Sequence, residues 1–254
     1  MPTLQNQDKN RPDASNFWHG FNPDGSTRGM TLAGKDGNDF LDGGYFNDTL
    51  NGGLGNDRLY GDLGDDLLIG GGGRDTAVYS YGASAYVVTH DSSDWHVASQ
   101  AGYGLGADTL QGIERIDFSG QALALDTDGV AGQAYRVYRA AFDRTPDLGG
   151  LGFWINALDT GFSLHDIASG FVQSNEFVKL YGTAPTNADI VGKLYQNILH
   201  RAPEQGGYAF WLDVLDNKKA DLPDVLAAIS ESAENQEAVA TLIANGIQFT
   251  PYGV

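Results

Sequence analysis

Cysteine is absent from the 254-residue chain. Its absence excludes disulfide bridges, a thiol nucleophile and a cysteine-bound metal. Long hydrophobic runs are absent as well, since no segment approaches the ~20 apolar residues of a membrane-spanning helix. Residues 1–28 are too polar for a secretory signal peptide, so the sequence gives no indication of export through the general secretory route.

Positive charge is scarce. Fifteen Lys and Arg residues face 33 Asp and Glu residues, which gives a net charge of −18. This balance argues against binding to nucleic acid or to an anionic membrane, and it makes metal cations the expected counterions. With 41% apolar residues, the chain is long enough to form a packed core and is expected to contain two domains.

Catalytic motifs are missing too. The five histidines never form His-Glu-x-x-His, and there is no Gly-x-Ser-x-Gly. We therefore expect no enzyme. His90, Asp91, Asp94 and His96 are close in sequence, but a solvated strand face is favoured there over a metal site. Two tryptophans, at positions 154 and 211, are expected in the core rather than as sugar platforms.

Glycine, by contrast, is abundant, with 35 residues, and much of it lies in a regular array. Five aspartates follow one another at intervals of nine residues. Each closes a glycine-rich hexapeptide that begins at Gly34, Gly43, Gly52, Gly61 or Gly70, and each is followed two residues later by Leu41, Leu50, Leu59, Leu68 or Ala77. A short strand would point that apolar residue inward, and the glycines would allow the tight turn that follows.

Such turns present backbone carbonyl and carboxylate oxygens, which are hard ligands that suit Ca²⁺ better than zinc or copper. A flexible solvated linker is the alternative, but five copies in register argue against it. The candidate metal-binding residues are Gly34, Asp36, Asp39, Gly43, Asp48, Gly52, Gly53, Gly55, Asp57, Gly61, Gly64, Asp66, Gly70, Gly71, Gly73 and Asp75.

The array resembles the calcium-binding β-roll of repeats-in-toxin proteins. The resemblance implies two repeats per turn, with calcium between loops stacked 18 residues apart. It implies at least three sites, which pair Asp39 with Asp57, Asp57 with Asp75, and Asp48 with Asp66. Three residues depart from the glycine pattern, so the last site is expected to be the least regular: Lys35, Phe46 and Asp62.

The flanks of the array complete a first domain. Residues 1–31, with Phe17, Trp18 and Phe21, are expected to cap the first turn of the roll. Strand-like segments rich in β-branched and aromatic residues continue to residue 118. The composition changes at residues 126–129, where a helix start or linker is favoured over a further calcium loop. We therefore expect a calcium-binding domain over residues 1–126 and a helical domain over residues 127–254.

The second half contains a longer repeat. Residues 138–154 match residues 195–211 at an offset of 57, through an Arg-x-Pro turn and a Phe-Trp pair, and Ser174-Asn-Glu matches Ser232-Ala-Glu at an offset of 58. Each unit is expected to contain three helices. Ser174 and Asn187 are expected N-caps, and Pro223 suits a first helical turn. Arg144 and Arg201 are expected to cap carbonyls or to pair with Asp147 and Glu204.

This half resembles an uncharacterised helical domain that accompanies repeats-in-toxin rolls and is similar to phycobilisome linker domains. The resemblance implies a structural or protein-binding role. The predicted fold class is α+β multidomain, with an N-terminal parallel β-roll and a flanking β segment, followed by an all-α domain of two related units.

The function expected from these features is that of a secreted calcium-binding structural or interaction protein of a surface layer, matrix or adhesion system. The alternative is a small secreted hydrolase or carbohydrate-binding protein with its site in the helical domain. Resemblance to the roll family implies type I secretion to the cell surface or medium. Expected partners are calcium, the secretion machinery, and either a second copy or an extracellular protein or polysaccharide.

Overall fold

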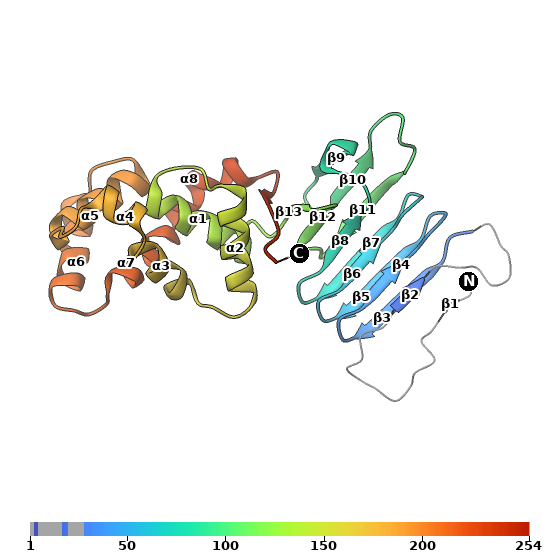
Figure 1. The fold of residues 1–254 in the computed structure, drawn as a ribbon, viewed down its shortest axis with the longest axis horizontal. Coiled ribbons are helices and arrows are strands. Elements are labelled where there is room, and N and C mark those ends of the chain that lie inside the picture. Colours follow the sequence, from blue (N-terminus) through green and yellow to red (C-terminus); the bar gives the residue numbers. More distant parts are fainter. Residues whose placement is uncertain (1–2, 5–16, 20–27, 254) are drawn as a thin grey trace. The chain divides into compact units, whose positions relative to one another are not determined.

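The computed structural model describes residues 3–4, 17–19 and 28–253, drawn in colour in Figure 1. The chain divides into two compact units, residues 1–125 and residues 126–254. The first unit is built from strands and the second mainly from helices, which confirms the predicted α+β architecture. In the described part of the chain, no helix has both the length and the apolar character needed to cross a membrane.

Successive strands of the first unit alternate between two sheets. One sheet takes β3 (Thr31–Asp36), β5 (Thr49–Leu54) and β7 (Leu67–Gly72), and the other takes β4 (Phe40–Asp42), β6 (Arg58–Tyr60) and β8 (Thr76–Tyr79). All neighbours among these strands are parallel, and residues 18 apart are in register, as with Leu32 and Leu50. The chain therefore winds as the predicted β-roll (Figure 1).

The strands β3, β5 and β7 of the first sheet are six residues long, so they extend beyond the short segments between the glycine-rich loops. Lys35 pairs with Gly53, and Asp36 pairs with Leu54, so the parallel ladder continues into the glycine-rich loop. The backbone of successive loops is therefore in contact from one turn to the next. This contact is what allows groups on stacked loops to approach closely.

The interior of the roll is only as wide as two facing side chains. It contains the predicted apolar column, whose members are fully buried: Leu41, Leu50, Leu59, Leu68 and Ala77. Leu32, which the prediction did not include, extends the column by one residue and is 1% exposed. Each leucine contributes about 1.5–3 kcal/mol through burial. A core this thin provides little reserve against the acidic loops at its edges.

The flanking β segment does more than close the roll. After η1 (Ala83–Ala85) and an antiparallel hairpin of β9 (Tyr86–His90) and β10 (Trp95–Ser99), β11 (Ala107–Gln111) pairs in parallel with β7. Next, β12 (Arg115–Phe118) pairs in parallel with β8, and β13 (Gln121–Ala124) is antiparallel to β12. The roll thus continues for another turn beyond the inserted hairpin.

At the other end, two short strands extend the sheets. β1 (Thr3–Leu4) pairs with β3, and β2 (Phe17–His19) pairs with β4, with Trp18 in register with Leu41. The backbone of this segment therefore covers the first turn as expected. Phe21, the third member of the expected apolar group, lies outside the described residues.

The second unit contains two sets of four helices, one more helix in each set than the sequence predicted. The first set is α1 (Val130–Phe142), α2 (Leu148–Asp159), α3 (Leu164–Val172) and α4 (Asn175–Tyr181). The second is α5 (Asn187–Leu199), α6 (Gln205–Asp216), α7 (Leu222–Ser230) and α8 (Ala233–Ile243), followed by the short β14 (Ile247–Phe249). The repeated Ser-x-Glu motif starts the helix that the prediction missed, α4 in one set and α8 in the other.

Capping residues explain where these helices begin. Ser174 accepts a hydrogen bond from the Phe177 N–H, and Pro223 lies in the first turn of α7, both as predicted. Asn187 is not a cap, because Thr186 precedes it and forms a capping box with Asp189. The side chain of Asp126 accepts from the Ala131 N–H at the start of α1, which supports the helix-start interpretation of residues 126–129.

Arginine–glutamate pairs join helices within each set. Arg144 binds Glu176 at 2.7 Å, and Arg201 binds Glu234 at 2.7 Å, so the main acid partners lie in the fourth helix of each set. Glu204 also pairs with Arg201, at 2.6 Å, whereas Asp147 is 3.7 Å from Arg144. The expected pairing of Arg201 with Glu204 is therefore confirmed, whereas Arg144 binds Glu176 more closely than the expected Asp147.

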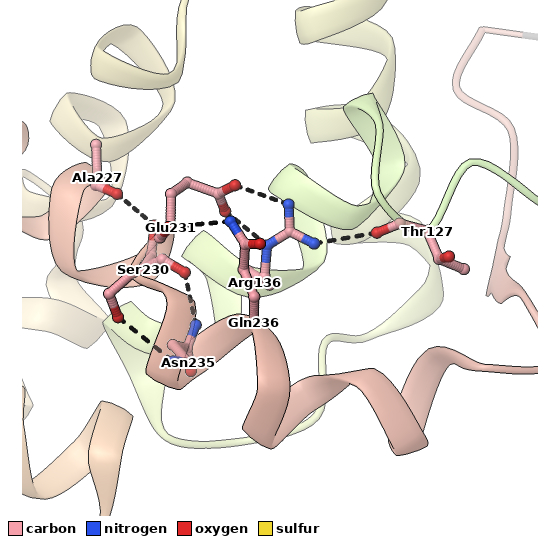
Figure 2. Close-up of polar contacts among 8 residues, drawn as sticks. Thr127, Arg136, Ala227, Ser230, Glu231, Asn235 and Gln236 are labelled. Carbon is pink, nitrogen blue, oxygen red and sulfur yellow. Dashed lines mark hydrogen bonds and ion pairs between the residues drawn. The ribbon is translucent and has the colours of Figure 1, made fainter.

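A further pair, without a counterpart in the internal repeat, crosses between the two sets. The buried Arg136 guanidinium on α1 binds Glu231 through two hydrogen bonds of 2.7 Å and donates to the Thr127 carbonyl at 3.0 Å (Figure 2). Beside it, Asn235 donates to the Ser230 carbonyl at 2.6 Å. Trp154 and Trp211 are partly buried and pack against the helical core, as the sequence predicted.

Candidate metal centre along the roll edges

The repeat aspartates form two ladders, one along each edge of the roll. On one edge, the Asp39 N–H donates to Asp57 Oδ1 at 2.7 Å and the Asp57 N–H donates to Asp75 Oδ1 at 2.8 Å. On the other edge, the Asp48 N–H donates to Asp66 Oδ1 at 2.7 Å. Each bond joins residues 18 apart, so the structure brings together the three pairs that the sequence had matched.

The second carboxylate oxygen of these aspartates faces the interior of the loop stack. Oδ2 of Asp48, Asp57, Asp66 and Asp75 is buried and accepts no hydrogen bond. A buried carboxylate oxygen without a donor is costly, because it has lost its hydration without compensation. Because the four atoms recur at the same position of the repeat, they form a set of oxygens suited to a positively charged ligand.

Burial also shifts the acidity of the same groups. Desolvation, with a smaller contribution from the charges of Asp108 and Asp48, raises the pKa of Asp66 from 3.8 to about 7, against the opposing hydrogen bond from the Asp48 N–H. Desolvation likewise raises the pKa of Asp48 and of Asp75 to about 6, and it raises the pKa of Asp57. Without a compensating cation, these buried carboxylates ionise less readily than ordinary aspartates.

The first glycine of each loop leaves room for the carboxylate of the same loop. A Cβ on Gly34 would lie 2.2 Å from Asp39 Oδ2, and a Cβ on Gly52 would lie 2.2 Å from Asp57 Oδ2. Gly43, Gly61 and Gly70 bear the same relation to their own aspartates. Any side chain at these positions would occupy the space next to Oδ2, so the array keeps that space open.

The second and fourth positions bring carbonyl oxygens to the interface between loops. Gly53 has a φ of 113°, and its Cβ would lie 1.8 Å from the Lys35 carbonyl oxygen. Gly55 is related in the same way to the Gly37 carbonyl. Gly64, Gly71 and Gly73 also have positive φ and face a carbonyl of the preceding loop on their edge. Stacked loops therefore contribute both carboxylate and carbonyl oxygens.

The three departures from the glycine pattern adopt the glycine conformation. Lys35, Phe46 and Asp62 have φ values of 98°, 78° and 66°. Side chains other than those of Asn and Asp rarely adopt such angles, at a cost of about 1–2 kcal/mol per residue. The loop geometry is thus imposed on these residues by the stack, and the structure retains the Asp48–Asp66 pair despite them.

Two further acids, Asp108 and Glu114, lie on the ladders although the nine-residue spacing did not predict them. The Asp66 N–H donates to Asp108 Oδ1 at 3.0 Å, and the Asp75 N–H donates to Glu114 Oε2 at 2.7 Å, across separations of 42 and 39 residues. Asp108 and Glu114 therefore continue the two ladders into the last turn. The identical tripeptides Asp48-Thr-Leu and Asp108-Thr-Leu were the available signal, hidden by the inserted hairpin.

The end of one ladder is closed by a protein group. The Tyr79 hydroxyl donates to Asp108 Oδ2 at 2.9 Å, so this carboxylate has both oxygens occupied. Burial raises the pKa of Asp108 to about 6, against the lowering effects of the bonds from Asp66 and Tyr79. The open oxygens of the repeated aspartates contrast with this closed last rung.

Other candidates lie apart from the ladders. Asp36 is exposed and in register with the exposed Leu54, so its side chain is not part of the buried ladder. Asp91 closes the β9–β10 turn by accepting from the N–H groups of Ser93 and Asp94, and it also lies 3.3 Å from His96 Nε2, all on an exposed face.

The helical unit has one group with metal-ligating atoms close together, made by His165, Asp221 and Asp224. These residues are only partly buried or exposed, and the two aspartates form the capping box of α7. His165 Nδ1 lies 2.8 Å from Asp224 Oδ1, and this contact raises the pKa of the histidine. The group is accounted for as a helix cap with an ion pair.

The donors at the roll edges fit a calcium ion. They are oxygen atoms only, they come from carboxylates and backbone carbonyls, and they converge from two loops in a buried space. Asp39 with Asp57, Asp57 with Asp75, and Asp48 with Asp66 would hold the ions, together with loop carbonyls. A bound divalent cation would satisfy the buried oxygens and keep the carboxylates ionised.

Comparison with known families agrees with this geometry. Residues 31–45 and 42–77 match the family described as the RTX calcium-binding nonapeptide repeat (4 copies). Residues 133–181 and 168–239 match the family described as a domain of unknown function, DUF4214. Both predicted resemblances are thereby confirmed, while the similarity to phycobilisome linkers stays a prediction.

Whole-chain comparisons add little. No curated protein matches the chain. A solved structure, the crystal structure of extracellular lipase LipA from Serratia marcescens, is similar over 32% of this chain and 14% of that chain, with 23% identity and a TM-score of 0.16. The similarity covers a small share of that lipase and carries no argument about activity.

Proposed function

Because the chain carries repeats-in-toxin calcium-binding repeats followed by a DUF4214 domain, we propose that it is a secreted, non-catalytic structural or interaction protein whose roll folds on extracellular calcium. The observation that carries this proposal is the row of buried aspartate oxygens without donors along the roll edges. The helical unit would supply the contact with a partner.

The residues of the roll account for the calcium dependence. Asp48 and Asp66 lie on stacked loops, and burial, followed by the charges of Asp108 and Asp48, raises the pKa of the Asp66 carboxylate. Without a cation, ionising such pairs in a thin roll is unfavourable. A bound calcium ion supplies positive charge to these rungs. Since it binds the folded roll only, its binding free energy adds to folding stability. We propose at least three such sites, one for each predicted pair.

The same dependence suits secretion. A roll that stays unfolded where calcium is scarce would be suited to passage through a type I exporter, and it would fold outside the cell. Extracellular calcium modules bind with Kd values on the order of 10⁻⁴–10⁻³ M, which matches a switch set by the external concentration. The net charge of −18 keeps the calcium-free chain extended through self-repulsion.

An interaction role for the helical unit is supported by its surface. Phe210, Phe162 and Leu242 are each more than half exposed although they are large and apolar. Large exposed apolar side chains mark a contact surface when they form one patch, which makes these three residues the first to substitute in a binding assay. We propose a surface-layer, matrix or adhesion component, whose partner is a second copy or an extracellular protein or polysaccharide.

The test is a folding and assembly assay on the full chain. Circular dichroism and size-exclusion chromatography are recorded in millimolar calcium and in EGTA. We expect calcium to add β-structure and compact the chain, while the helical signal stays constant, and we expect assembly or partner binding only in calcium. Identical spectra and elution in both conditions would overturn the proposal.

A further inference from the structure

The roll unit contains a groove that the calcium sites do not use. Its volume is about 440 Å³, within the range of about 300–1,000 Å³ typical of small-ligand sites. The loops that hold Asp48 and Asp66 line part of it, and the end of β8 with the chain that follows lines another part. All of its lining residues belong to the roll unit.

The loop side of the groove comes from the third position of three stacked loops. Tyr45 and Leu63 form a parallel bridge, and the Leu63 N–H donates to the Gly44 carbonyl at 2.9 Å. In the next turn, the Gly64 N–H donates to the Leu105 carbonyl at 3.0 Å. The side chains of Tyr45, Leu63 and Leu105 therefore stand in a column, and that of Tyr45 is 69% exposed.

The opposite side is made of tyrosines. Tyr79 is held by its hydrogen bond to Asp108, and its ring packs edge-on against Tyr86 at 4.9 Å between centroids. Tyr81 is 48% exposed and is steadied by Tyr103, whose ring centroid lies 5.5 Å away. Tyr79 and Tyr86 are each only 8% exposed and form the floor against which the groove is built, so the rings open to a ligand are those of Tyr45 and Tyr81.

The polar groups in the groove select the ligand class. Asp62 and Ser80 contribute a carboxylate and a hydroxyl beside the rings, and the lining contains no Lys, Arg or His. With a protein charge of −18, an anionic ligand such as a phosphate or an acidic sugar is disfavoured. Aromatic faces accept the C–H face of a sugar ring, while a carboxylate accepts hydrogen bonds from its hydroxyls.

We propose that this groove binds a neutral saccharide. The proposal rests on the proposed calcium-dependent folding, because the loops of Asp48 and Asp66 build one wall. The proposed saccharide site lies on the roll unit. The carbohydrate site expected as an alternative from the sequence was in the helical domain. Binding is therefore expected to require calcium, even though no calcium ligand touches the sugar.

The test uses the calcium-loaded full chain and saturation-transfer NMR with a panel of neutral trisaccharides: cellotriose, maltotriose, mannotriose and chitotriose. Choline chloride is the cationic probe. We expect at least one trisaccharide to bind, and its affinity to fall roughly tenfold in Tyr81→Ala and in Asp62→Asn. The asparagine variant keeps a residue that tolerates positive φ, so the loop stays folded.

Tyr252→Ala is the matched control, because it removes a 57% exposed tyrosine ring from the helical unit. Its affinity should equal that of the natural chain. The proposal is overturned if no neutral trisaccharide binds, if choline alone binds, or if Tyr81→Ala binds as tightly as the control. Circular dichroism on the same samples separates the two proposals: a roll that folds with calcium but binds no sugar refutes only the groove.

Discussion

Replacing Asp66 by asparagine should change the roll in opposite directions with and without calcium. The carboxylate of Asp66 is buried, its Oδ2 accepts no hydrogen bond, and Asp48 and Asp108 lie close enough to raise its pKa. Asparagine has nearly the same shape but no charge. Without calcium the substitution removes a repulsion, and with calcium it removes a ligand.

The magnitude follows from the pKa. A pKa of about 7 in the folded roll, against 3.8 in the unfolded chain, corresponds to at most about 4 kcal/mol at a pH above 7. Solvent screening and a weaker hydrogen bond from the Asp48 N–H reduce the expected gain to about 1–2 kcal/mol. In calcium, the loss of one charged ligand should weaken binding on the order of tenfold.

The stability of the calcium-free roll should depend on pH because the pKa of Asp66 differs between the folded and unfolded states. Between about pH 4 and pH 7, the folded calcium-free roll binds a proton at Asp66 that the unfolded chain has released. Its stability therefore falls as the pH rises through this window. The gain from Asp66→Asn should be full near pH 8 and absent near pH 4.

Urea unfolding followed by circular dichroism measures these effects, with EGTA at two pH values and with a calcium titration near pH 8. Helix unfolding is followed separately at 222 nm to keep the two units distinct. If Asp66→Asn were no more structured than the natural chain in EGTA near pH 8, the electrostatic argument would be wrong. An unchanged calcium midpoint would remove Asp66 from the ligand set.

Three further outcomes are expected. Asp57→Ala combined with Asp66→Ala removes one carboxylate from each of the three predicted pairs. The double variant should form no calcium-induced β-structure in circular dichroism, while its helical signal stays unchanged. A calcium-induced transition like that of the natural chain would refute the pairing. Lys35→Gly relieves a residue with φ of 98° and should stabilise the calcium-loaded roll by about 1 kcal/mol in urea unfolding, whereas no gain would mean that the turn is unstrained. Arg136→Ala removes a buried guanidinium and leaves the partly buried Glu231 without its partner, so it should cost the helical unit about 3 kcal/mol, against about 1 kcal/mol or less for the more exposed Arg144→Ala. Equal losses in thermal unfolding would contradict this ranking.

The roll could be predicted from the sequence because its loops and strands repeat every nine residues. Nine-residue spacing places Asp39 above Asp57, and a leucine two residues later faces inward, so register and core follow from counting. The last acids of each ladder were not predicted, because they do not follow the nine-residue spacing. Asp108 and Glu114 reach the ladders across separations of 42 and 39 residues, because a hairpin interrupts the count.

In the helical half, the repeat itself was visible but its contacts were not. The matching Ser-x-Glu motifs marked a fourth helix, whose glutamate pairs with the arginine at the end of the first helix of the set, 32 residues away in the case of Arg144 and Glu176. A sequence-local view favoured the nearer acid at Asp147. The Arg136–Glu231 pair joins residues 95 apart and has no repeated signature, so only the folded structure shows it.

The central claim is that calcium ions lie between stacked aspartates at the roll edges. Anomalous diffraction from crystals grown in millimolar calcium near neutral pH tests it directly. The account predicts anomalous peaks within about 2.3–2.6 Å of the Oδ2 atoms of Asp57 and Asp66 and of carbonyl oxygens from neighbouring loops. Water or empty density beside both atoms under those conditions would contradict it.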